Sequence, residues 1–302
     1  MKQQQASATA FTVQQGVLYT AQNPRYFGLV SEETKDACVK ILASSREGRK
    51  RLKQLGSWWF VQLAPLIECL VMPGITLHYV LRKRYIEELT VQVIQEGVSQ
   101  VINLGAGLDT LACRLAKRYP NVNFIEADHP ATQQIKTRSL ETSQNKFENL
   151  HLIPVDFTTQ KLEEALKQCS GFSADKVTLF ILEGVLMYLD EAQIRQLFNS
   201  LKQAIHTRIE VIFTAAEPAS KSRNSHGLLL KLYLRFKGEP LHWTCEKEDI
   251  NGFLQSMGYA LNRLADYRDF RRRYLRSIET GAMHEGEYIA VARHNQGNGL
   301  IL

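Results

Sequence analysis

The chain has 302 residues, of which 44% are hydrophobic and 23% are charged, enough apolar material to bury a full core. That length suits one large α/β domain with an appendage. The formal net charge of +6 is spread over many segments, so it favours acidic partners only weakly, and no nucleic-acid partner is expected.

The five cysteines are odd in number, widely spaced and without a C-x-x-C pair. Neither a disulfide framework nor a zinc site is therefore predicted, and reduced thiols of a cytoplasmic protein are expected. Residues 1–13 lack the apolar run of a secretory signal, and we expect a polar arm without regular structure there. The most apolar stretch, residues 58–80, is interrupted by two prolines, a glutamate and a histidine, so no membrane span and no membrane partner are expected.

The first part of the chain predicts helices. Residues 16–56 are polar, and their cations between Arg46 and Lys53 indicate a solvated helix face, with a docking patch as the alternative. The apolar stretch 58–80 predicts a cap packed on the sheet, or a lid whose inner face lines an apolar substrate pocket, and the two interpretations are compatible. We expect residues 1–80 to form an arm and a helical cap or lid, and residues 81–302 to form the core, with a substrate-side insertion near 217–246.

The segment from Gln100 to Asp128 predicts a strand, a glycine turn, a helix and a second strand ending in an acidic residue. Residues 101–104 are apolar, the turn is Gly105-Ala106-Gly107, and apolar residues recur at helical spacing over 108–116. This is one βαβ unit of a doubly wound sheet, whose ligand should bind beyond the carboxyl ends of the strands.

The residues after the glycines bear on the identity of that ligand. A dinucleotide-binding fingerprint has a third glycine at the position of Thr110. In such proteins the pyrophosphate binds at the N-terminus of the helix, where this chain has the carboxylate of Asp109. A carboxylate there repels phosphate but suits a nucleoside that carries a sulfonium charge, such as S-adenosyl-L-methionine. Asp128 follows Gly105 by 23 residues, where it can accept both ribose hydroxyls. A nicotinamide or flavin, or a purely structural turn, remains an alternative.

Strands and helices continue to alternate as far as residue 214, which predicts a mostly parallel sheet covered on both faces. Acidic residues end the second, third and fourth predicted strands at one edge of this sheet: Asp128, Asp156 and Glu183. Further on, we expect helices over 228–236 and 247–257 and an antiparallel pair of strands over 259–264 and 288–292. The arginines of 268–276 indicate a solvated helix face or a docking site for an acidic partner.

Five motifs in order, LRKRYIEE, QVINLGAGLDTLACRLA, FIEADHPATQQIK, VDF and ILEGVLMYL, resemble the leucine carboxyl methyltransferase family, which includes polyketide and other natural-product O-methyltransferases. The resemblance is good over residues 76–205 and loose beyond them. It implies a Rossmann-like class I methyltransferase, with a doubly wound, mostly parallel seven-stranded sheet and an N-terminal helical cap.

The resemblance also implies roles for individual residues. An arginine, Arg82 or Arg84, is expected on the carboxylate of S-adenosyl-L-methionine. The other expected cofactor residues are Gly105, Ala106, Gly107 and Asp109 in the loop, Asp128 at the ribose, Asp156 and Phe157 at the adenine, and also His129 and Glu183. The chain departs from the family in lacking an Asp-Pro-Tyr-Ala-like segment over residues 31–43, which leaves the substrate class open, and in having Phe157 where leucine is common.

Methyl transfer from a sulfonium is an in-line displacement, which depends chiefly on positioning and needs no metal. A carboxylate acceptor needs no base, whereas a hydroxyl acceptor benefits from one. His78 and Tyr188 are candidates for a catalytic role, although a buried, packed side chain is the simpler interpretation of each.

The expected function is therefore S-adenosyl-L-methionine-dependent O-methylation of a hydroxyl or carboxyl on a small, largely apolar natural product of polyketide or nonribosomal peptide type. The acceptor could be free or tethered to a carrier, and the second product is S-adenosyl-L-homocysteine. The alternatives are carboxyl methylation of a protein C-terminus and a non-catalytic, cofactor-binding interaction module. The sequence leaves the acceptor and the oligomeric state open.

Overall fold

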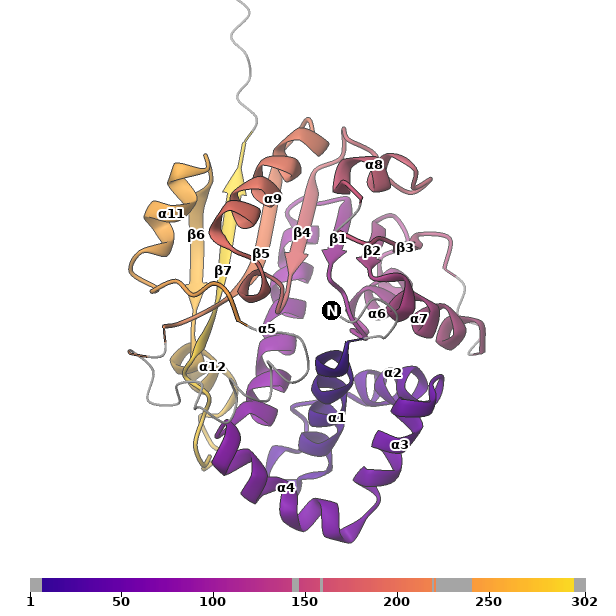
Figure 1. The fold of residues 1–302 in the computed structure, drawn as a ribbon, viewed down its shortest axis with the longest axis vertical. Coiled ribbons are helices and arrows are strands. Elements are labelled where there is room, and N and C mark those ends of the chain that lie inside the picture. Colours follow the sequence, from indigo (N-terminus) through magenta and orange to yellow (C-terminus); the bar gives the residue numbers. More distant parts are fainter. Residues whose placement is uncertain (1–6, 143–146, 158–159, 219, 221–240, 296–302) are drawn as a thin grey trace, which may run out of the picture.

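The computed structural model describes residues 7–142, 147–157, 160–218, 220 and 241–295. Seven strands form one sheet in the order β3-β2-β1-β4-β5-β7-β6 (Figure 1). Their bounds are β1 Gln100–Leu104, β2 Asn123–Asp128, β3 Leu150–Pro154, β4 Thr178–Leu182, β5 Ile209–Ala216, β6 Ala260–Ala265 and β7 Glu287–His294. Strands β1 to β5 run parallel, and β7 pairs antiparallel with both β5 and β6. The predicted doubly wound sheet, including its antiparallel last pair, is confirmed.

Apolar side chains fill both faces of the sheet because successive strand residues point to opposite sides. Val101 and Leu179 pack in one core, and their neighbours Ile102 and Phe180 pack in the other. The first core includes residues of α5 (Ile75–Gln95), α6 (Leu111–Arg118) and α12 (Tyr267–Tyr274). The second includes residues of α8 (Leu162–Lys167), α9 (Glu191–Ala204) and α11 (Ile250–Ser256). The helix α7 (Pro130–Thr142) packs beside β2 and β3.

The N-terminal helices gather at the end of the molecule toward which the parallel strands run (Figure 1). They are α1 (Ala8–Gln22), a short 3-10 helix (Pro24–Tyr26), α2 (Glu32–Ala43), α3 (Arg46–Leu55) and α4 (Trp58–Val71). The prediction of an irregular arm over residues 1–13 is wrong from Ala8 onward. The two glutamines that directly follow this segment are buried and paired, since Gln14 Oε1 accepts from Cys38 Sγ at 2.9 Å and Gln15 Nε2 donates to Gln54 Oε1 at 3.0 Å. Packing on α5 thus outweighs a weak local preference.

The apolar stretch 58–80 is divided between α4 and the beginning of α5. None of the residues of α4 is buried, so α4 itself lacks the packing expected of a cap, whereas Leu77 and Val80 of α5 are buried. The break occurs at Gly74, whose φ of 75° is left-handed. The helix α5 runs unbroken across residues 80 and 81, and the predicted division into two domains there stays a prediction.

Two expected helices differ from what the structure describes. The helix expected over 247–257 is shorter, spanning Ile250–Ser256. The helix expected over 228–236 lies outside the described residues.

The arginines around 268–276 lie largely on α12, where Arg273 Nε donates to Glu88 Oε2 at 2.7 Å. Within the described ranges, no single helix is both long and apolar enough to cross a membrane.

Candidate functional site

A cavity of about 710 Å³ lies beyond the carboxyl ends of the parallel strands. Its lining includes the residues that follow β1, β2, β3 and β4, together with parts of α1 and α5 and the segment before β7. The strand order reverses between β1 and β4, which is where doubly wound sheets bind their ligands. The volume lies in the range of small-molecule sites, roughly 300 to 1,000 Å³.

The glycine turn after β1 forms the floor of this cavity. Gly105 has a φ of 67° and Gly107 a φ of 52°, a left-handed conformation that glycine adopts without steric cost. A Cβ atom on Gly105 would lie 2.7 Å from Val185 Cγ2, and one on Gly107 would lie 3.3 Å from Ala10 Cβ. The turn therefore packs closely against the loop after β4 and against α1, and its residues line the cavity.

Asp128, the last residue of β2, holds this turn in place. Its Oδ2 atom accepts from the backbone N–H of Gly107 at 2.6 Å, and its Oδ1 atom accepts from that of His129 at 2.7 Å. Each carboxylate oxygen keeps a further lone pair, and Asp128 lines the cavity. The imidazole of His129 accepts from the N–H of Ala131 at 3.3 Å, so it also supports the first turn of α7.

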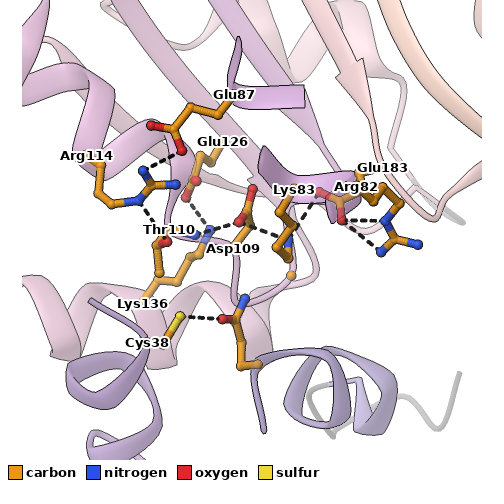
Figure 2. Close-up of polar contacts among 12 residues, drawn as sticks. Cys38, Arg82, Lys83, Glu87, Asp109, Thr110, Arg114, Glu126, Lys136 and Glu183 are labelled. Carbon is orange, nitrogen blue, oxygen red and sulfur yellow. Dashed lines mark hydrogen bonds and ion pairs between the residues drawn. The ribbon is translucent and has the colours of Figure 1, made fainter. Parts of the chain in front are cut away.

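Glu183, directly after β4, is held between two cations of α5 (Figure 2). Its Oε1 atom accepts from Arg82 Nε at 2.9 Å and Nη2 at 2.8 Å, and its Oε2 atom accepts from Lys83 Nζ at 3.1 Å. Lys83 Nζ also donates to Asp109 Oδ1 at 3.0 Å. All four residues line the cavity. The arrangement fixes two cations at one wall while leaving some of their N–H donors available.

A second carboxylate, Glu287 at the start of β7, also pairs with Arg82 and lines the cavity. Its Oε2 atom is 2.6 Å from Arg82 Nη1 and 2.6 Å from His78 Nε2. Burial raises the pKa of Glu287, but the charge of Arg82 and the hydrogen bond from His78 outweigh it and hold that pKa well below its ordinary value. His78 is 2% exposed and is not among the residues that line the cavity. His78 therefore lies outside the lining of the cavity and contacts it through Glu287, and its catalytic role stays a prediction.

Asp109 is a buried, paired carboxylate rather than a bare charge at the entry of α6. Burial raises its pKa, but Lys83 and the more distant Lys136 and Arg114 lower it to about 2. Lys136 and Arg114 have carboxylate partners of their own in the same region (Figure 2). Because Lys83 compensates the charge of Asp109, repulsion between this carboxylate and a pyrophosphate does not by itself identify the ligand, which corrects the argument from sequence.

The structure brings together most of the predicted residues. The cavity is lined by Arg82, Gly105, Ala106, Gly107, Asp109, Asp128, His129, Asp156, Phe157, Glu183 and Tyr188. Phe157 is 46% exposed at the outer part. Arg84 does not line the cavity, because it turns away toward Gly28, whose carbonyl oxygen accepts from Nη1 at 3.3 Å, and its guanidinium lies over the ring of Tyr274. Of the two expected arginines, Arg82 is the one that faces the site.

Sequence reasoning missed three contributions to the cavity. The first turns of α1 line it, including Thr9 and Val13, although this segment was expected to be an irregular arm. His284 also lines it, with its ring centroid 5.1 Å from that of His78. Lys83 carried a signal, since it lies in a run of three cations, whereas nothing near His284 resembles a site motif. Among the described residues, no three His, Cys, Asp or Glu side chains are grouped so as to hold a metal ion.

The sequence model of the family described as leucine carboxyl methyltransferase matches residues 34–202, more than half of the chain. The chain belongs to the leucine carboxyl methyltransferase family. This family member is 29% identical over 182 residues to "Putative S-adenosyl-L-methionine-dependent methyltransferase YktD" of Bacillus subtilis (strain 168). That alignment covers 59% of each chain, so the family member spans less than two thirds of that relative.

Two solved structures share the fold of this family member. A DUF574 family protein from Streptomyces avermitilis superposes with a TM-score of 0.60 at 11% identity, over 85% of this chain and 96% of that one. A "putative methyltransferase" from Thermobifida fusca superposes with a TM-score of 0.57 at 13% identity, over 85% and 94%. At such low identity these matches establish the architecture alone, a seven-stranded Rossmann-like sheet with flanking helices.

Proposed function

We propose that the protein is an S-adenosyl-L-methionine-dependent methyltransferase that methylates an oxygen atom of a small, largely apolar acceptor. The observation that carries the proposal is the geometry of Asp128, whose carboxylate closes the glycine turn through Gly107 and still presents lone pairs to the cavity. Membership of the leucine carboxyl methyltransferase family supports the same reading.

The residues present fit the cofactor. Asp128 is proposed to accept the ribose hydroxyls, with Asp156 and Phe157 beside the adenine at the outer part of the cavity. The remaining N–H donors of Arg82 and Lys83 suit the carboxylate of the methionine part. Around them the carboxylates of Asp109, Glu183 and Glu287 outnumber these two cations, and such an excess of negative charge favours a ligand with ammonium and sulfonium groups.

The cofactor supplies a methyl group bound to a positively charged sulfur. The protein's contribution is to bring an acceptor oxygen into line behind that methyl group, because holding two reactants in near-attack geometry removes much of the entropic barrier. Arg82, Lys83 and Glu183 orient one end of the donor through a rigid, buried network, and Asp128 orients the other. The helix α1, which touches the glycine turn through Ala10, keeps water away from the donor.

The acceptor site is proposed to be the apolar part of the cavity, lined by Met72, Ile75, Val185, Met187 and Leu241. Such a wall favours a bulky, apolar acceptor of natural-product type over a charged peptide end. A carboxylate acceptor would require no base. For a hydroxyl acceptor, His284, His242 and Tyr188 are among the side chains of the cavity that could remove the proton.

The test is calorimetric titration of S-adenosyl-L-homocysteine and, separately, NAD into the protein and two variants. Asp128→Asn should weaken S-adenosyl-L-homocysteine binding by about 1 to 3 kcal/mol, because hydrogen bonds to a charged carboxylate are lost. Asp175→Asn is the matched control, since Asp175 is exposed and bonds His206 away from the cavity. Tight NAD binding, or equal affinity of both variants for S-adenosyl-L-homocysteine, would contradict the proposal. Release of S-adenosyl-L-homocysteine with a panel of apolar alcohols and acids then identifies the acceptor group.

A further inference from the structure

The helix α4 exposes an unusual amount of apolar surface. Six of its large apolar side chains are between 49% and 69% exposed: Trp58, Trp59, Leu63, Leu66, Ile67 and Leu70. Its only charged residue, Glu68, is turned toward α5, where its Oε2 atom accepts from Thr76 Oγ1 at 2.8 Å. The outward surface of α4 is therefore uncharged and, apart from Gln62, largely apolar, which marks an interaction site.

Most of this exposed apolar surface lies on one face of the helix. At 3.6 residues per turn, five of the six side chains fall within an arc of about 100°, and Trp58, the first residue of α4, points outside it. The five are Trp59, Leu63, Leu66, Ile67 and Leu70. A helix with one such apolar face can lie in the interfacial layer of a lipid bilayer with that face buried.

Positive charge lies next to this surface. The preceding helix α3 exposes Arg46, Arg49, Lys50 and Lys53, and the two tryptophans follow it after a short turn. Tryptophan is enriched where a protein meets the headgroup layer of a membrane. Lysine and arginine next to such a surface attract anionic lipids. The order of charge, aromatic pair and aliphatic residues is therefore complementary to an anionic bilayer.

The geometry decides how α4 would lie in that bilayer. With 14 residues, α4 is about 21 Å long, shorter than the roughly 30 Å hydrocarbon core. Together α4 and α5 have the length and composition of a span, but they are bent by 85° at the break. The helix α5 is committed to the protein core, where Leu77, Leu81 and Ile86 are buried. A bilayer can therefore accept α4 along its surface but not the pair across its width.

We propose that α4, with the basic face of α3, docks the protein on an anionic lipid surface, with α4 lying in the interface. This revises the expectation from the sequence that no membrane partner exists. The helix α4 ends at Val71, and Met72 and Ile75 just beyond it line the cavity. Docking would thus bring the apolar wall of the cavity to the bilayer, where an acceptor dissolved in lipid could enter. That last step rests on the proposed methyl transfer, whereas docking does not.

The test is co-sedimentation with vesicles of phosphatidylcholine alone and of phosphatidylcholine with phosphatidylglycerol, without cofactor or acceptor. The protein should bind the anionic vesicles, with a blue shift of tryptophan emission, and bind neutral ones at least about tenfold more weakly. Trp59→Gln with Leu66→Gln should lower binding at least about tenfold. Lys50→Gln with Lys53→Gln should lower it by about tenfold and reduce its salt dependence by about half, because two of the four exposed cations of α3 remain.

Phe27→Gln is the matched control, because Phe27 is an apolar residue that is 87% exposed but lies outside α4. It should leave vesicle binding unchanged. Equal binding by the α4 variant and the protein, or no preference for anionic vesicles, overturns the proposal. A third outcome also overturns it: the protein does not bind vesicles, and ultracentrifugation shows a dimer that the α4 variant converts to a monomer. In that case α4 contacts a second copy of the chain. All variants should bind S-adenosyl-L-homocysteine as the protein does, so a failure of docking is distinguishable from a failure of the proposed function.

Discussion

Arg82 on α5 and Glu287 on β7 form a buried ion pair, with 2.6 Å between Nη1 and Oε2. The same guanidinium holds Glu183 after β4, so one arginine joins the helix before the sheet, a central strand and the last strand. Removing one member of a buried ion pair destabilises a protein by more than the intact pair stabilises it, because the remaining charge is left buried without a counter-charge. The position of Arg82 in the cavity therefore depends on a residue far along the chain.

Glu287→Gln should lower the free energy of unfolding by about 3 kcal/mol, because it leaves the buried Arg82 short of a counter-charge. It should also weaken S-adenosyl-L-homocysteine binding, since Arg82 is then less firmly oriented. Urea unfolding and calorimetry measure the two effects. Glu191→Gln is the control, because the pair of Glu191 with Arg195 is exposed, and no measurable change is expected. A Glu287→Gln variant as stable as the parent would show that the pair does not support the fold.

Asp109 should contribute to unfolding at acid pH. Its pKa is lowered from 3.8 to about 2, so its contribution is present above pH 4 and is lost as the pH falls from about 4 through 2. The contribution amounts to about 2 kcal/mol. Asp109→Asn should therefore be less stable than the parent at pH 7, and its stability should fall less steeply between pH 4 and 2. Free energies of unfolding from urea titrations at several pH values provide the measurement, and identical slopes would contradict the assignment.

Lys83→Met should weaken binding of S-adenosyl-L-homocysteine by at least about tenfold, because it removes a cation from the cavity wall and leaves Asp109 without its close partner. The neighbouring Arg84→Met is the control. Arg84 is directed at Gly28 and Glu88, outside the cavity, so its loss should leave the affinity unchanged. Calorimetry measures the affinity of both variants for S-adenosyl-L-homocysteine. A larger loss of affinity in Arg84→Met than in Lys83→Met would show that Arg84, and not Lys83, faces the ligand.

Gly74→Ala should disturb the cavity from a distance. A Cβ atom there would lie 2.4 Å from the carbonyl oxygen of Ala282 and 2.8 Å from the backbone nitrogen of His284, so this segment must shift. Gly28→Ala is the control, because Gly28 has a φ of 80° but no atom within 4 Å of the added Cβ. Both variants carry a strain of about 1 kcal/mol from the left-handed backbone. Only Gly74→Ala should lose more stability than that and also lose affinity for S-adenosyl-L-homocysteine; equal losses in the two variants would exclude the close contact.

The sequence predicted the parts of the site whose residues lie close together in the chain. The glycine turn and Asp128 belong to one βαβ unit, in which the spacing of apolar residues indicates the strands and the helix, and glycine and proline indicate where they end. The choice between Arg82 and Arg84 could not be made, because residues two apart on a helix point about 200° apart. Which of them faces inward depends on how α5 packs on the sheet, and that packing involves residues distant in sequence.

Other features depended on tertiary contacts that no local pattern signals. Asp109 gains its counter-charge from Lys83, 26 residues earlier. The segment containing Thr9 lines the cavity because the glutamines that follow it are buried and hydrogen-bonded. Glu287 was predicted to precede a strand, but its pairing with Arg82 follows from the position of that strand between β5 and β6.

The place of β7 in the sheet has a consequence for the order in which the protein matures. Glu287 begins β7, which is synthesised after β6 but inserts between β5 and β6. A nascent chain that has emerged from the ribosome only as far as β6 therefore leaves one edge of β5 unpaired and β6 without any partner strand, and it lacks the Glu287 counter-ion of Arg82. Closure of the sheet and completion of the charged wall are thus one event that must await the synthesis of β7, and a ligand that requires this wall can bind only afterwards.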